Sequence, residues 1–141
     1  MNKPGPFEIM AHTADVGLRV RGGDRKKLFT NAAAGMMSII TDSKTVAPAA
    51  VKGIEIEAED FSALLVAWLN EIIFLIEAHG MLFSRFRIDS LTDTELVGRV
   101  EGEPLDQAKH QIKTEIKACT YHELKTGKDK SGWFAQVIFD V

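Results

Sequence analysis

The spacing of apolar residues predicts two helices in this chain. The first helix is expected from the N-cap candidate Asp24 to about Ile40, because apolar or small residues recur there at helical spacing: Leu28, Ala32, Gly35 and Ile39. The second is expected over about 60–79 and ends before Gly80, a favoured terminator. Its apolar face is broad, which indicates deep burial against a sheet.

The remaining patterns predict strands joined by short turns. Alternating or continuous apolar runs indicate strands over 7–12, 16–21, 54–58, 85–91, 95–101, 112–121 and 133–141. Loops are expected over 45–53 and 125–132, and a short helical turn after Pro104. Together these elements predict an α+β fold, with a mostly antiparallel or mixed sheet packed against two main helices. No linker divides the chain, so residues 1–141 are expected to form a single domain.

Composition narrows the classes of function. The net charge of −3 gives no basic face in bulk, which argues against an autonomous nucleic-acid binder and leaves room for a protein partner. The only cysteine is Cys119, so a reducing, cytoplasmic compartment is expected. The second helix is interrupted by Asn70 and Glu71 and is expected to be too short and too polar to span a membrane.

Two acidic residues within predicted elements allow more than one interpretation. Asp15 lies at the corner between the first two strands, where it is either a turn-capping carboxylate or a ligand. Glu71 lies at the edge of the apolar arc of the second helix, whereas Asn70 is expected to point away from it. A carboxylate there either is partly desolvated and needs a cation or donor, or extends to water.

Asp140 ends the last apolar strand and is followed by Val141. If the end of the chain is ordered, the α-carboxylate of Val141 and the side chain of Asp140 converge, and two such charges repel unless a cation lies between them. Oxygen-only ligands of this kind suit a hard ion such as Ca²⁺ or Mg²⁺. The alternative is a frayed tail in water.

The common enzyme motifs are absent from the sequence. The four histidines show no zinc spacing, and there is no phosphate-binding loop, dinucleotide fingerprint or nucleophile elbow. Cys119 and His122 are expected to face opposite sides of a strand, which disfavours a nucleophilic pair.

Four segments together resemble one family. They are "HTADVGLRV" at 12–20, "LLVAWLNEIIFL" at 64–75, "EIKACTYHEL" at 115–124 and "GWFAQVIFDV" at 132–141. In this order and spacing they look like archease, and the resemblance covers nearly the whole chain. It implies a metal site at Asp15, Asp140 and Val141. With less support, it also implies residues that matter for activation, namely Glu71, Lys117 and His12.

The resemblance also implies a function. Archeases assist the RtcB-type RNA ligase of tRNA splicing by promoting its GTP-dependent guanylylation and repeated turnover. We therefore expect a non-enzymatic activator that binds a divalent metal, Ca²⁺ first, with Mg²⁺ or Mn²⁺ as alternatives. Its expected partner is the ligase, with RNA contacted only through it and no DNA or membrane partner. Two other functions stay open: a metal-dependent hydrolase or nuclease, with Glu71 or His12 activating water, and a chaperone-like adaptor without a metal.

Overall fold

The computed structural model describes residues 5–11 and 14–141. Within these ranges two α-helices, α1 (Arg25–Ile40) and α2 (Phe61–His79), and a short 3₁₀ helix, η1 (Ser43–Thr45), accompany seven strands. The strands are β1 (Phe7–Ala11), β2 (Asp15–Gly22), β3 (Ala50–Glu57), β4 (Met81–Leu91), β5 (Glu95–Pro104), β6 (Ala118–Asp129) and β7 (Gly132–Asp140). The α+β class predicted from the sequence is confirmed.

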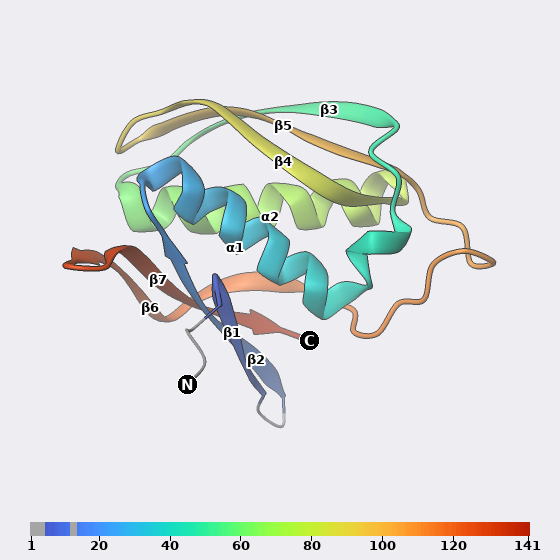
Figure 1. Cartoon of the computed structure of the whole chain (residues 1–141), viewed down its shortest axis with the longest axis horizontal. Helices are drawn as coiled ribbons and strands as arrows, with labels where there is room; N and C mark the ends of the chain where they lie inside the picture. Colours follow the sequence, from blue (N-terminus) through green and yellow to red (C-terminus); the bar gives the residue numbers. More distant parts are fainter. Residues whose placement is uncertain (1–4, 12–13) are drawn as a thin grey trace.

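The elements form three layers, with both helices between two antiparallel sheets (Figure 1). One sheet has four strands in the order β1-β2-β7-β6, and the other has three in the order β3-β5-β4. The sequence predicted helices on a sheet but did not divide the strands between two sheets. The division explains the breadth of the apolar faces, because each helix is covered on opposite sides.

Local side-chain chemistry sets the ends of the helices. The Asp24 carboxylate accepts a hydrogen bond from the backbone N–H of Lys27, and Asp60 does the same for Ala63, so both are N-caps. Gly80 ends α2 with a φ of 60°, in the left-handed region that favours glycine. The sequence analysis predicted Asp24 and Gly80 in these roles, and the structure confirms both.

Helix α2 forms the centre of the core. Trp68 is fully buried, and its indole N–H donates to the carbonyl of Phe29 in α1 at 3.0 Å. By length and composition alone α2 is long and apolar enough to cross a membrane, so the sequence prediction that it is too short and too polar was wrong. Much of this apolar surface is buried between the two sheets, as in the core helix of a folded domain.

Several strand boundaries differ from the sequence predictions. Residues 50–53 of the expected loop belong to β3, and Pro104 ends β5 and starts no helix. Segment 112–117, expected as a strand, is irregular, whereas β6 continues to Asp129 through most of the loop expected over 125–132. In β3, β5 and β6, pairing with a neighbouring strand outweighs the local turn-forming composition, whereas residues 112–117 take part in no strand pairing among the described residues.

Candidate metal centre

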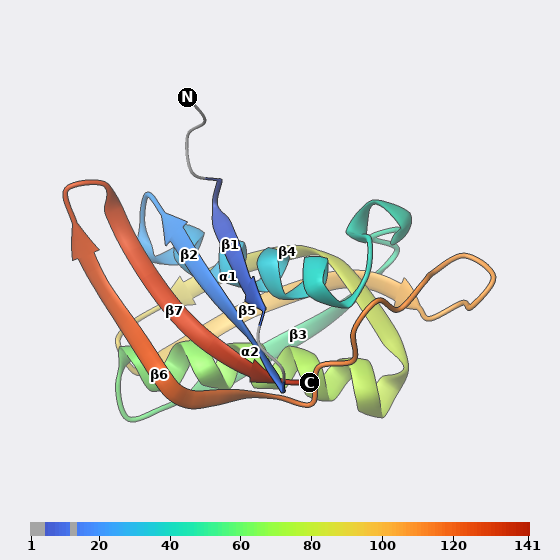
Figure 2. The same ribbon diagram turned by 90° about the horizontal axis from the view of Figure 1, so that it is seen from below.

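Asp15 and Asp140 lie directly opposite each other on adjacent strands. Asp15 opens β2, Asp140 closes β7, and the antiparallel register pairs the two residues. Their neighbours Val16 and Phe139 pair on the face turned to the helices, so both aspartates belong to the outer face of the sheet. Directly opposed residues have Cβ atoms about 4.5–5.5 Å apart. Figure 2 shows the end of β7 beside the start of β2. We call this pair of residues the acidic pair.

One oxygen of the acidic pair has no hydrogen-bond partner among the described residues. Oδ1 of Asp15 is buried and accepts no hydrogen bond from the residues that the structure describes. The buried oxygen of Glu101 differs, because Arg85 and Arg87 lie 3.5 and 3.7 Å from that carboxylate. No such ion pair to Asp15 occurs within residues 5–11 and 14–141. An unpaired buried carboxylate oxygen is costly, and a small hard cation is one group that would satisfy it.

The end of β7 is held in place from two sides. The backbone N–H of Lys117 donates to the carbonyl of Asp140 at 2.8 Å, and Ala118 pairs with Asp140 from β6. Val141 is half-buried and packs against the core. The acidic pair is therefore attached to a folded sheet and is not on a frayed tail.

The donor set points to the kind of ion that would fit. In the described ranges no three side chains among His, Cys, Asp and Glu gather into a metal site. A cation at the acidic pair would have two carboxylates, main-chain oxygens and water as ligands. Such an oxygen set suits Ca²⁺, Mg²⁺ or Mn²⁺, whereas zinc sites usually use histidine or cysteine.

The three residues expected to matter for activation are placed differently. Lys117 directly precedes β6, and its side chain is exposed. Its backbone N–H bonds to Asp140, so the residue is next to the acidic pair. Glu71 is half-buried on α2, and neither its side chain nor that of Lys117 makes a hydrogen bond or ion pair to another described residue. His12 lies outside the described residues.

Asn70 does not point away into solvent, contrary to the sequence prediction. Its amide nitrogen donates to the carbonyl of Cys119 at 3.0 Å, and its amide oxygen accepts from the N–H of the same residue at 2.8 Å. These two bonds fasten α2 to β6 one residue from Ala118, the pairing partner of Asp140. The helical wheel missed this role because the four-stranded sheet covers the flank on which Asn70 lies.

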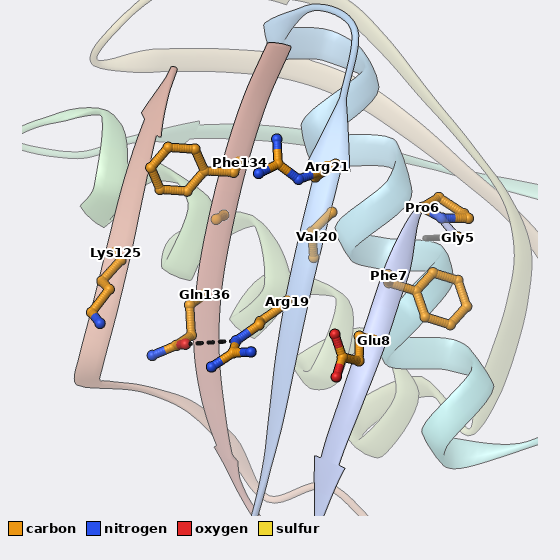
Figure 3. Close-up of a pocket in the computed structure, with 11 residues that line it drawn as sticks. Gly5, Pro6, Phe7, Glu8, Arg19, Val20, Arg21, Lys125, Phe134 and Gln136 are labelled. Atoms are coloured by element: carbon orange, nitrogen blue, oxygen red, sulfur yellow. Dashed lines mark hydrogen bonds between the residues drawn. The ribbon is translucent and has the colours of Figure 1, made fainter. Parts of the chain in front are cut away.

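A basic pocket occupies the same outer face farther along the strands (Figure 3). It has a volume of about 580 Å³, and Arg19, Arg21 and Lys125 line it together with Glu8 and Phe134. The Nε of Arg19 donates to Gln136, and Arg21 pairs with Asp129 at 2.9 Å. Arg19 is four residues from Asp15, about 13 Å along an extended strand. The face therefore has negative charge at one end and an excess of positive charge further along.

A network around Glu103, which the sequence analysis did not predict, holds the segment that leads to the acidic pair. One oxygen of Glu103 lies 2.7 Å from the Lys109 ammonium, 2.8 Å from the N–H of Ala47 and 2.9 Å from Nε2 of His110. Nδ1 of His110 accepts from the N–H of Asp106, so in the neutral ring Nε2 carries the proton. The hydrogen bonds from Lys109, Ala47 and His110 lower the pKa of Glu103 to about 2.

This network predicts an acid-sensitive segment. Because the folded state lowers the pKa of Glu103, its contribution is complete above the ordinary value of 4.5 and is lost as the pH falls toward about 2. Hydrogen exchange of residues 105–117 should therefore accelerate between pH 4.5 and 2, after correction for intrinsic rates. In Glu103→Gln it should already be fast at pH 6 and change little with acid. Equal protection in both proteins at pH 6 would contradict the role given to Glu103.

Comparisons with known proteins agree over nearly the whole chain. Residues 7–141 match the model of the Archease protein family (MTH1598/TM1083). The chain is 38% identical to protein archease of Methanopyrus kandleri and 34% identical to that of Methanosarcina barkeri. Each alignment covers 96% of this chain, and 99% and 95% of the respective relative.

Two solved structures share the fold. Protein 1598 of Methanobacterium thermoautotrophicum has a TM-score of 0.79 at 32% identity, and the match covers 96% of this chain and 99% of that one. A Thermotoga maritima protein described as an archease and possible chaperone has a TM-score of 0.63 at 24% identity, with 100% and 98% covered. At that identity the second likeness concerns the fold alone.

Proposed function

The chain belongs to the archease family, and we propose from this premise that it is a metal-binding activator of an RtcB-type RNA ligase in tRNA splicing. Family membership itself implies a non-catalytic activator or a chaperone-like role, and it implies tRNA splicing. The ligase as partner, the metal and the promotion of GTP-dependent guanylylation are parts of the proposal. We place this activity in the cytoplasm, in keeping with a single, buried cysteine.

The observation that carries the proposal is the buried oxygen of Asp15, which accepts no hydrogen bond from the described residues, in a residue directly opposite Asp140. Asp15 and Asp140 would hold one divalent ion, with main-chain oxygens of Val141 beside them. A bound divalent ion supplies positive charge next to the phosphates of a nucleotide, which favours phosphoryl transfer. Ca²⁺ is the ion we propose first, with Mg²⁺ and Mn²⁺ as alternatives that accept the same oxygen ligands.

The other residues of the chain position this site. Asn70 and Lys117 fix the backbone on the β6 side of the acidic pair. The Lys117 ammonium would add a positive charge that binds phosphate at the same end of the sheet. We propose that Glu71, one residue after Asn70 on α2, and His12 contribute to activation. Asp15 and Asp140 would then act when their end of the sheet meets the nucleotide-binding site of the ligase. RNA would be contacted only through the ligase.

A ligation assay with the cognate ligase tests the proposal. RNA ends bearing a 3′-phosphate and a 5′-hydroxyl are incubated with GTP, metal and ligase, with this protein present in trace amounts. The ligase alone should stop after about one turnover, and the added protein should permit many. Incubation of the protein alone with RNA and Mn²⁺ should leave the RNA intact. Cleavage in that control, or no gain in turnover, would contradict the proposal.

A further inference from the structure

An apolar groove opens at the C-terminal ends of the two helices and is not explained by metal binding. It has a volume of about 270 Å³, enough for one or two large apolar side chains. Its walls come from the C-terminal halves of α1 and α2, the start of β4 and the irregular segment before β6. Those walls include Ile73, Ile76, Leu105, Ile112 and Ile116. We call it the tip groove.

The tip groove leaves apolar surface in contact with water. Leu105 is 38% exposed and Ile112 is 41% exposed, and Phe74, next to Ile73 on α2, is 55% exposed. Single exposed apolar side chains are ordinary, but a concave cluster of them is typical of a surface that buries a partner's side chain.

The charges at the rim restrict what that partner presents. The charged residues that line the groove are Glu77 and Glu115, and both are exposed. A segment that places an apolar side chain in the groove therefore binds more tightly if it carries lysine or arginine on either side of that residue. A segment flanked by acidic residues would be repelled.

The wall of the groove and the proposed metal site are joined through one short stretch of backbone. Ile116 is part of its wall, and the next residue, Lys117, donates its backbone N–H to the carbonyl of Asp140 at 2.8 Å. A protein that docks in the tip groove with the surface around its nucleotide site therefore lies close to the strand end that carries the acidic pair. Because nucleotide sites carry positive charge for phosphates, such a surface matches both the groove rim and the acidic pair in sign.

We propose that the tip groove is the docking site for a basic, apolar segment of the ligase and supplies affinity, whereas the acidic pair supplies activation. This inference rests on the proposed function. It separates two quantities that a single assay can measure: the half-maximal concentration of this protein and the maximal activation at saturation. Docking residues affect the first, and residues of the metal site affect the second.

Titration of the full-length protein into the ligase assay tests this division. Ile112→Ser, and separately the double variant Glu77→Lys with Glu115→Lys, should each raise the half-maximal concentration about tenfold. Both should leave maximal activation unchanged. Val51→Ser is the matched control, because Val51 is 54% exposed on β3 and does not line the groove. It should change neither quantity. Added salt should weaken the unsubstituted protein more than the charge-reversed one.

Three results would overturn the proposal. The first is a half-maximal concentration for Ile112→Ser equal to that of the unsubstituted protein, with the unfolding midpoint preserved. The second is lower maximal activation at an unchanged half-maximal concentration. The third is a self-associated state that Ile112→Ser dissolves without weakening ligase binding, because that assigns the groove to a second copy. If the unsubstituted protein gives no activation, the proposed function itself fails, and a groove-specific failure leaves it standing.

Discussion

Asp140→Asn is expected to lower maximal ligase activation by at least about a hundredfold, with little change in the concentration needed for docking. Asparagine keeps the shape of the side chain but removes one of the two opposed carboxylates on β2 and β7. A neutral amide binds a hard divalent cation far less well than a carboxylate does. Asp15→Asn should have the same effect, because both carboxylates would contact the same ion. The measurement is single-turnover guanylylation of the ligase at a saturating concentration of each variant.

Stability measurements separate loss of function from loss of folding. Without divalent ions, Asp140→Asn should be at least as stable as the unsubstituted protein, because it removes repulsion between like charges. Glu55→Gln, which neutralises an exposed carboxylate on β3, is the control and should activate normally. Full activation by Asp140→Asn would exclude metal handling at this pair as the mechanism.

Trp68→Ala is expected to give the largest loss of stability, about 3–5 kcal/mol in the free energy of unfolding. The indole is fully buried in α2, and truncation leaves a cavity between the two sheets. The lost indole N–H also leaves the Phe29 carbonyl of α1 without its bond to Trp68. Denaturant unfolding measures the effect, provided that the dependence of the free energy of unfolding on denaturant concentration is the same in both proteins.

Trp68→Phe divides this loss into its two causes. It keeps an aromatic ring but removes the hydrogen bond and the part of the indole that a phenyl ring does not fill, so the expected loss is smaller, about 1–3 kcal/mol. Trp133→Ala, at a half-buried position in β7, should cost less than Trp68→Ala. A loss below about 1 kcal/mol for Trp68→Ala would contradict the central place given to α2.

The sequence carried the local signals of the fold well. Asp24, Asp60 and Gly80 mark helix ends that depend on hydrogen bonds and backbone angles within a few residues. The limits of β3 and β6 depended instead on pairing with distant strands. Pairing with β5 extends β3 back to Ala50, against the loop-like composition of that stretch. No local pattern encodes such a partner.

The candidate site shows the same division. Asp15 and Asp140 stood out by their positions at the ends of apolar strands, but only the register of β2 against β7 brings them opposite each other. The hydrogen bonds of Asn70 to Cys119 and the network of Glu103 with His110 were not predicted, because they join residues 7 to 56 positions apart. The buried oxygen of Asp15 is likewise a property of packing and cannot be read from the chain.

The most direct test of the account is calorimetric titration of Ca²⁺ into the protein and its Asp15→Asn and Asp140→Asn variants. We predict one ion bound per chain in the unsubstituted protein and no measurable heat of binding in either variant, and the same contrast for Mn²⁺. Binding by both variants with unchanged affinity, or none by the unsubstituted protein at millimolar ion, would contradict a cation site at the acidic pair.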